Sequence, residues 1–236
     1  MTRRIDSEPA YVLHARAYRE SSSIVDLLTL RHGRLSVVVK GARGGARAAA
    51  RVQPFGRMLV RCSGRGSLLT LAGCESLTHR WLAGEALFAG LYLNEVLLRL
   101  LRDDDPHPRL FEGYEHALDA LAGGTEVEPV LRGFERLLLK ECGYELTLAI
   151  AADSGAPVEP AAAYRYVPDG GFHRVEEPVD ERLVYAGATL LAIDADDYTD
   201  PRARRAAKYI LRRALAPHLG DRPLKSRALY RVGKSQ

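Results

Sequence analysis

The chain has 236 residues, of which 47% are hydrophobic and 27% are charged, with a formal net charge of +4. This size fits one large or two small domains, and the composition is that of an ordinary globular protein. The sequence has no apolar run near the roughly 20 residues of a membrane helix, no apolar signal segment at its start, and only three widely spaced cysteines, which form neither a disulfide framework nor a CxxC metal clip. We therefore expect a cytoplasmic protein that does not associate with a membrane.

The charge is distributed unevenly along the chain. Residues 27–74 contain nine Arg or Lys and no Asp or Glu, residues 75–199 contain 24 acidic and ten basic residues, and residues 200–236 contain eleven basic and two acidic residues. Charge separated on this scale attracts a polyanion to defined surfaces. We expect a phosphate backbone, because each neutralised phosphate releases condensed counterions. The alternative is an Arg-rich protein whose basic faces are only solvated.

The first 80 residues show the apolar alternation of short β-strands. The alternation begins near Tyr11 and resumes after a turn at Gly33. Five short strands suit a small closed barrel, because closure removes exposed edges. We predict an α+β protein in which residues 1–80 form a five-stranded OB-fold barrel that binds nucleic acid. Its strands are expected near residues 11–18, 24–30, 35–39, 58–62 and 68–71.

A glycine- and arginine-rich loop separates the third and fourth predicted strands. Its arginines recur at four-residue intervals, so they share one face if the segment turns helical. We predict that the barrel contacts DNA phosphates through Arg34, Lys40, Arg43, Arg47 and Arg51. Three aromatic residues either stack bases beside these cations or pack in the core, namely Tyr11, Tyr18 and Phe55.

From Gly84 onward the apolar spacing becomes helical, and glycines or acidic residues before proline end the segments. We predict a helical domain over residues 81–236, with helices near 84–101, 110–121, 129–142, 181–193 and 201–216. A cysteine-free excursion near residues 151–178 is expected to form a hairpin, in which residues 164–166 pair with 172–174. A basic tail follows Gly220, and we predict that its Lys225 and Arg227 contact phosphates.

No motif in the sequence predicts catalysis. Fragments of the phosphate-binding pattern GxxxxGK[ST] near both Lys225 and Lys234 lack one of its two glycines. Acidic runs at 103–105 and 194–197 lack the ligand spacing of a calcium loop, and neither HExxH nor GxSxG occurs. We expect a protein that is not an enzyme and holds no cofactor. The contrasting class is a metal-dependent nuclease that uses the acidic runs.

Four segments resemble the RecO family of bacterial recombination mediators. They are AYVLHARAYRESSSIVDLLTLRHGRLSVVVKGAR at 10–43, LYLNEVLLRLL at 91–101, LRGFERLLLKECGY at 131–144 and RAAKYILRRALAPHLGDRPLKSRALYR at 205–231. The resemblance implies an OB barrel followed by a helical domain. It implies binding to single- and double-stranded DNA and annealing of complementary strands. It also implies partnership with RecR and the single-strand-binding protein SSB. With RecR, and in some settings RecF, such proteins help RecA to replace SSB.

The resemblance also suggests where the acidic, phenylalanine-ended C-terminal tail of SSB would bind. The LRxFE motif lies on the third predicted helix, where Arg132 and Arg136 are four residues apart and Lys140 continues the basic stripe. Guanidinium groups would pair with the carboxylates of the tail, and neighbouring apolar residues would receive its terminal ring. These apolar residues are Leu131, Leu138 and Leu139. The alternative is an amphipathic core helix with a solvated basic edge.

Two features depart from the family pattern. Some relatives carry a four-cysteine zinc module, but residues 151–178 contain no cysteine, so we expect no structural zinc. Gly133 stands where some relatives have a basic residue, which is expected to weaken binding of an acidic ligand. We predict a DNA-binding mediator on the nucleoid, which anneals strands by holding both on a basic surface. The alternative is an OB-fold RNA-binding or translation-associated protein.

Overall fold

The computed structural model describes residues 2–42, 44, 52–176 and 183–233, with side chains described up to residue 229. The chain divides into two compact units. Unit 1 consists of Met1–Thr125 and Arg222–Gln236, and unit 2 consists of Glu126–Asp221. Strands give way to helices near residue 80, as the sequence indicates. The expectation that residues 1–80 form a separate domain stays a prediction, because unit 1 combines these strands with helical segments from both sides of unit 2.

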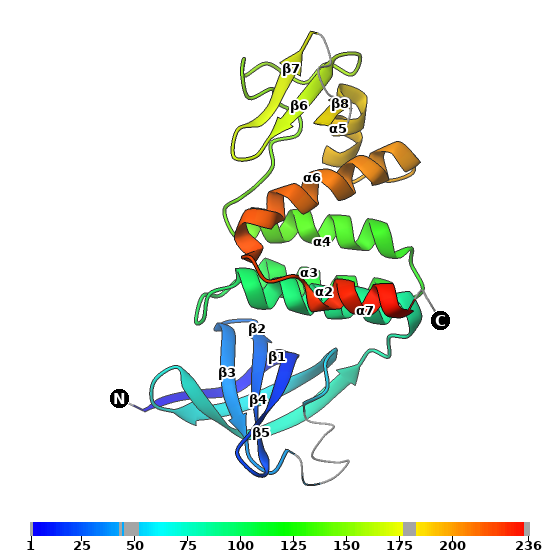
Figure 1. Ribbon diagram of the computed structural model, residues 1–236. Helices are drawn as coiled ribbons and strands as arrows, with labels where there is room; N and C mark the ends of the chain where they lie inside the picture. The colour runs from blue at the N-terminus through cyan, green and yellow to red at the C-terminus, as the bar shows by residue number, and fades with distance from the viewer. Residues whose placement is uncertain (1, 43, 45–51, 177–182, 234–236) are drawn as a thin grey trace. The chain divides into compact units, whose positions relative to one another are not determined.

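Unit 1 is built on a closed barrel of five strands (Figure 1). The strands are Arg3–Tyr18 (β1), Ser22–Thr29 (β2), Gly33–Val39 (β3), Gly56–Gly64 (β4) and Leu68–His79 (β5). Their order is β1-β2-β3-β5-β4, and β3 pairs with β5 in parallel. Closure gives every strand two neighbours, so the backbone groups along the edges find partners. The predicted α+β class and the OB-fold barrel are confirmed.

The core of the barrel follows the two-residue period of its strands. Along β3, Leu35, Val37 and Val39 are buried, and the residues between them are half-buried. The turn into this strand needs glycine. Gly33 has a φ of +66°, and a Cβ atom there would lie 2.0 Å from the carbonyl oxygen of Asp105. The same alternation determines which side chains of the barrel reach solvent.

A buried tyrosine joins the barrel to the helix α3 (Pro108–Ala122). The Tyr11 ring lies between those of Phe111 and Tyr114, with centroids 5.3 and 5.2 Å away. The Tyr11 hydroxyl donates to Glu115 at 2.9 Å and accepts from Arg80 at 2.8 Å, and its burial raises the pKa of Tyr11. Of the two roles considered for Tyr11, the structure therefore shows core packing.

The C-terminal residues form a docked helix where the sequence analysis expects a tail. The helix α7 (Lys225–Gly233) packs against α2 (Gly84–Leu100). On α2, the Glu95 carboxylate accepts hydrogen bonds from the backbone N–H groups of Lys225 and Ser226, both at 2.9 Å, and from the Ser226 hydroxyl at 2.7 Å. Leu224 is buried at the start of this segment. This segment is therefore part of the packed structure of unit 1, because its first turn is anchored and part of it is buried.

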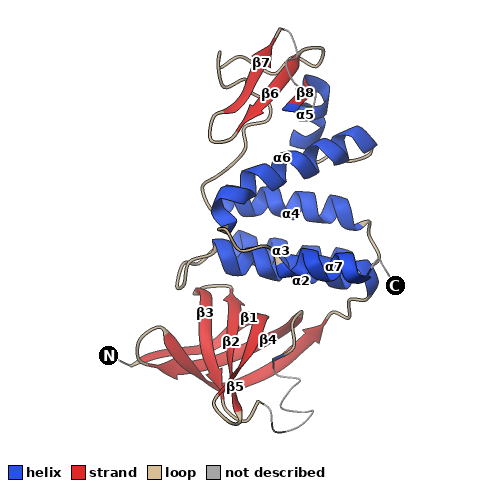
Figure 2. Ribbon diagram, viewed as in Figure 1, coloured by secondary structure: helices blue, strands red, loops and turns tan. Residues whose placement is uncertain are grey.

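Unit 2 combines three helices with a small antiparallel sheet (Figure 2). The helices are Val127–Glu141 (α4), Gly187–Asp194 (α5) and Pro201–Leu219 (α6), and the strands are Ala163–Val167 (β6), Gly171–Val175 (β7) and Val184–Ala186 (β8). The predicted hairpin is present as β6 and β7, and Tyr164, Tyr166 and Phe172 are buried in it. Residues 181 and 182 of the helix predicted over 181–193 lie outside the described residues. The prediction is wrong over Val184–Ala186, which form β8 and pair with β6, and a helix follows at Gly187–Asp194.

Candidate nucleic-acid interface

Three cations of the acid-free segment are paired with acids from other parts of unit 1. The shortest N–O distances are 2.8 Å for Arg31–Glu8, 2.8 Å for Arg34–Asp103 and 2.7 Å for Arg57–Glu115. Arg34 also donates to the Leu98 carbonyl at 2.5 Å. The Arg34 guanidinium, which is predicted to contact DNA, therefore holds β3 against the last turn of α2 and the segment that follows it. DNA binding by Arg34 stays a prediction, but its donors already have protein partners.

Three other cations of the barrel are exposed, and no ion pair involves them within the described part of the chain. They are Lys40, Arg61 and Arg65. Lys40 directly follows β3. Arg61 is on β4, where it lies opposite Gly73 of β5, so β3 and β4 are the two neighbours of β5. Val39 and Cys62 point into the core, and the alternation therefore turns Lys40 and Arg61 outward. Two strand spacings separate their backbones, about 10 Å.

The outer face of β3, β5 and β4 is therefore the candidate interface of the barrel, with Arg65 in the turn between β4 and β5. Lys40 also leads into the predicted phosphate-binding loop, but the loop residues Arg43, Arg47 and Arg51 lie outside the described residues, and their role stays a prediction. Arg61 and Arg65 are not among the residues predicted to contact DNA. The signal in the sequence that points to them is their position inside the acid-free segment.

The aromatic residues considered for base stacking differ in accessibility. Phe55 is buried like Tyr11, and a Cβ atom at Gly90 of α2 would lie 2.8 Å from its ring. Tyr18 is half-buried near the end of β1, with the Arg19 guanidinium 5.1 Å from its ring centroid. Of the three rings, only Tyr18 is accessible to a base.

At the other end of the sequence, α7 presents the two predicted phosphate ligands differently. The Lys225 side chain is exposed, whereas Arg227 is half-buried with its guanidinium 5.6 Å from the ring centroid of Tyr92. A cation over an aromatic face is held by the ring quadrupole. Arg227 therefore stabilises the packing of α7, and phosphate contacts by either residue stay a prediction.

The predicted tail-binding helix α4 does not present an open basic stripe. Arg132 is 7% exposed, and one of its terminal nitrogens lies 2.7 Å from the carboxylate of Glu135, which is 1% exposed. Arg136 lies 2.6 Å from Asp196 and donates to backbone carbonyls of α5. Leu138 and Leu139 belong to the buried core of unit 2, and Leu131 is half-buried.

A hollow of about 240 Å³ nevertheless lies beside this helix. It is lined by Gly133, Arg136, Leu137, Leu139, Lys140, Glu145, Leu146 and Asp196. Two of the predicted tail-binding residues, Arg136 and Leu139, thus meet at one surface feature, whereas Arg132 and Leu138 do not reach it. Lys140 is the exposed cation at its edge, 2.6 Å from Glu145. Binding of an acidic tail there stays a prediction.

Comparison with known proteins resolves the family. Residues 2–80 match the family model of the Recombination protein O N terminal domain, and residues 82–228 match that of the Recombination protein O C terminal domain. The chain is 47% identical over 226 residues to the DNA repair protein RecO of Stutzerimonas stutzeri, covering 94% of this chain and 92% of the relative. It is 45% identical to DNA repair protein RecO of Pseudomonas aeruginosa over 227 residues, covering 95% and 94%. For the RecO protein of Coxiella burnetii the identity is 41% over 233 residues, covering 97% and 99%.

The chain belongs to the RecO family of DNA repair proteins. Similarity extends over both units, so it is not confined to the barrel that many nucleic-acid-binding proteins share. Membership in RecO favours DNA repair over the RNA-binding or translation-associated alternative.

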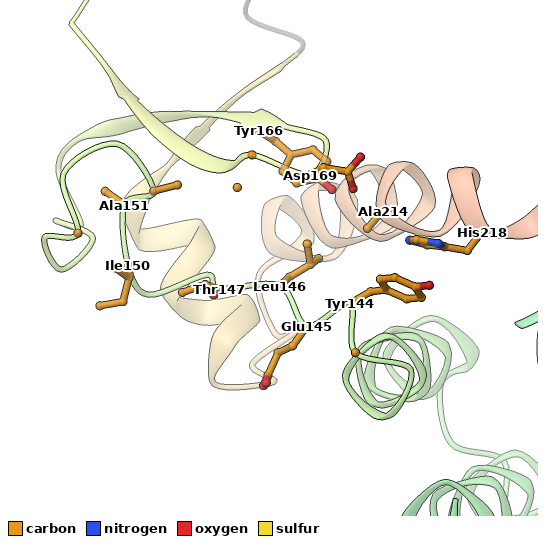
Figure 3. Close-up of a pocket in the computed structure, with 15 residues that line it drawn as sticks. Tyr144, Glu145, Leu146, Thr147, Ile150, Ala151, Tyr166, Asp169, Ala214 and His218 are labelled. Carbon is orange, nitrogen blue, oxygen red and sulfur yellow. The ribbon is translucent and has the colours of Figure 1, made fainter. Parts of the chain in front are cut away.

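A larger hollow of this RecO-family protein lies in unit 2, and the sequence analysis did not anticipate it. Its volume is about 550 Å³ (Figure 3). The ring of Tyr144 is stacked on that of His218, with centroids 3.6 Å apart. Glu145 and Asp169 add carboxylates to the lining. This combination of acidic groups and small side chains does not suit a phosphate, so we do not assign the hollow to DNA.

Two further features of this RecO-family chain concern metals and membranes. Across the described ranges, no three His, Cys, Asp or Glu side chains are grouped as metal ligands. None of the described helices is both long and apolar enough to cross a membrane. The three cysteines are free, and burial raises the pKa of Cys62 to about 11. Its thiol therefore stays protonated at neutral pH, as expected of a core residue.

Proposed function

We propose that this RecO-family protein is a non-enzymatic mediator, which binds single- and double-stranded DNA and anneals complementary strands. With RecR, and in some settings RecF, it helps RecA to load on SSB-coated DNA during recombinational repair. This role would place it on the nucleoid. The observation that carries the proposal is the barrel's outer face, where Lys40, Arg61 and Arg65 are exposed and form no ion pair with any described residue.

Annealing requires no covalent chemistry. Two single strands repel each other through their phosphates, and a surface with unpaired cations reduces this repulsion while raising the local concentration of both strands. Contacts with phosphates do not read the bases, so binding is expected to be nearly independent of sequence. A strand loaded with SSB adds a second requirement, because the mediator has to reach DNA that another protein covers.

The barrel face is tested by removing two of its cations, with two paired cations as a matched control. The double variant K40A/R61A should flatten the dependence of log K on log salt by about 1.4 for single-stranded DNA, since each phosphate contact contributes about 0.7. The control R4A/R16A removes the same charge from the same barrel, but these arginines lie 2.9 Å from Asp6 and 3.4 Å from Asp26. If K40A/R61A and R4A/R16A are both folded and both have the wild-type slope of log K against log salt, DNA does not bind on this face.

We further propose that the acidic tail of SSB docks at the 240 Å³ hollow beside α4, with Lys140 and Arg136 as its cations. The charge reversal of Arg132 is a poor test, because this buried side chain neutralises Glu135. Lys140→Glu is the better variant, because the side chain is exposed and its loss leaves the core unchanged. It should weaken binding of a tail peptide and leave binding of naked DNA unaffected. Arg174→Glu, which reverses an exposed cation paired with Glu159, is the control.

A further inference from the structure

The helix α6 carries six cations and no acidic residue, and the fold separates these cations into two sets. At 100° per residue, Arg204 and Lys208 fall on the flank that meets α4, where they lie 2.7 Å from Glu126 and 2.6 Å from Glu128. The buried residues of α6 itself are alanines, one isoleucine and leucines, and they form the rest of its inner face. The paired cations therefore have a structural explanation.

The other set lies on the opposite face, and it consists of Arg202, Arg205, Arg212 and Arg213. All four side chains are exposed, and within the described residues none takes part in an ion pair. Successive positions along this face repeat at three or four residues, so the guanidinium groups form a stripe about 16 Å long. Tyr209 lies in the middle of this stripe with 55% of its surface exposed.

Local helix energetics do not explain the stripe. Arg202 and Arg205 stand in the first turns of α6, where positive charge opposes the helix dipole. Like charges spaced along one face also repel each other. A helix face that departs from these local preferences, with no ion pair to any described residue, is typical of a site that meets a ligand.

We propose that the α6 stripe, defined as Arg202, Arg205, Tyr209, Arg212 and Arg213, is a second binding site for single-stranded DNA, located on unit 2. The arginines would contact phosphates, and the exposed Tyr209 ring would stack with a base. This inference rests on the proposed function and deepens it, because annealing requires surfaces for two strands. An acidic peptide is the less favoured ligand, since peptides need an apolar pocket for an anchor and the stripe contributes only Tyr209 and Ala216 between its arginines.

The test compares two double variants of the full-length protein that lose the same charge from the same helix. R212A/R213A removes two of the four arginines of the stripe, and R204A/K208A removes the two cations paired with acids at the start of α4. Alanine is a strong helix former, so both variants should fold. Binding of labelled oligo-dT is measured by fluorescence anisotropy at several salt concentrations. The slope of log K against log salt should be reduced in magnitude by about 1.4 in R212A/R213A and should be unchanged in R204A/K208A. Equal slopes for the two variants would overturn the inference.

Two single variants separate the roles of charge and stacking. Tyr209→Leu should weaken oligo-dT binding about tenfold without changing the salt slope, because stacking releases no counterions. Arg202→Glu should keep or raise the melting temperature, because an acidic residue suits the first turn, while weakening DNA binding. Wild-type affinity in both variants would count against the stripe.

The outcomes also distinguish this inference from the proposed function. If the wild-type protein fails to bind oligo-dT, both are wrong. If K40A/R61A lowers the slope and R212A/R213A does not, the barrel site stands and the α6 site is wrong. A polyglutamate peptide serves as the last probe. Loss of its binding in R212A/R213A, with DNA binding intact, would make the stripe a protein site and would overturn the proposal.

Discussion

At the scale of single residues, the function of each cation depends on the acid that reaches it. The barrel segment without Asp or Glu is strongly basic in sequence, yet Arg31, Arg34 and Arg57 are neutralised by acids that come before or after it in the chain. The exposed cations Lys40, Arg61 and Arg65 come from the same segment and carry the same charge. What sets them apart is their outward position and the lack of an ion pair among the described residues.

Arg132 shows how burial changes the contribution of a charge to the free energy of unfolding. Replacing it with methionine should lower the free energy of unfolding by about 3–5 kcal/mol, because the Glu135 carboxylate then stays buried without this guanidinium. The double variant R132M/E135L should recover most of the loss, since an apolar pair of similar volume avoids the desolvation of two charges. Urea denaturation of the three proteins measures both values. Equal stability of Arg132→Met and the wild type would show that this ion pair is not buried in solution.

At the scale of elements, the first turn of the C-terminal helix α7 is anchored by a carboxylate of α2. Glu95 accepts two backbone N–H groups there, which any N-terminal turn of a helix leaves unsatisfied. Burial on its own would raise the pKa of Glu95, but the hydrogen bonds from Ser226, Lys225 and Arg99 outweigh it and hold the pKa below its usual value. A carboxylate on one helix thus acts as the cap of another.

This arrangement predicts that docking of α7 depends on pH. Because the pKa of Glu95 is lowered in the folded protein, its contribution is complete above the unfolded value of about 4.3 and is lost as the pH falls through the folded value. Hydrogen exchange at the amides of Lys225 and Ser226, corrected for intrinsic rates, should therefore accelerate as the pH falls below the unfolded value and through the lower folded value. Glu95→Gln should accelerate it at neutral pH, with a loss of about 2 kcal/mol. Protection unchanged in that variant would show that α7 is anchored elsewhere.

At the scale of the whole molecule, the boundaries of the compact units differ from the point where strands give way to helices. Unit 1 includes the barrel, α2, α3 and α7, although unit 2 interrupts it in sequence. The reason is visible at Tyr11 and Phe55, whose rings are covered by side chains of α3 and by α2. A barrel without these helices would expose both rings.

A pair of fragments tests this organisation. A fragment of residues 1–80 should be unstable, because exposure of two large rings costs about 2–3 kcal/mol each, which approaches the total stability of a small domain. A fragment of residues 1–125 should unfold cooperatively, since it keeps α2 and α3. Circular dichroism during thermal denaturation distinguishes them. A stable, cooperative fragment 1–80 would instead support the barrel as a domain of its own.

The sequence by itself determined the class of the fold and the positions of most elements, because strand alternation, helical spacing and helix-ending glycines are local signals. Residues such as Leu35, Val37 and Val39 show their burial in their own spacing. Only the tertiary structure decided that residues 184–186 form a strand, since β8 depends on pairing with β6. It also decided which cations of the described residues form ion pairs. Pairs such as Arg34–Asp103 and Arg204–Glu126 join residues far apart in the chain, and a count of charges along the sequence contains no information about distances in space.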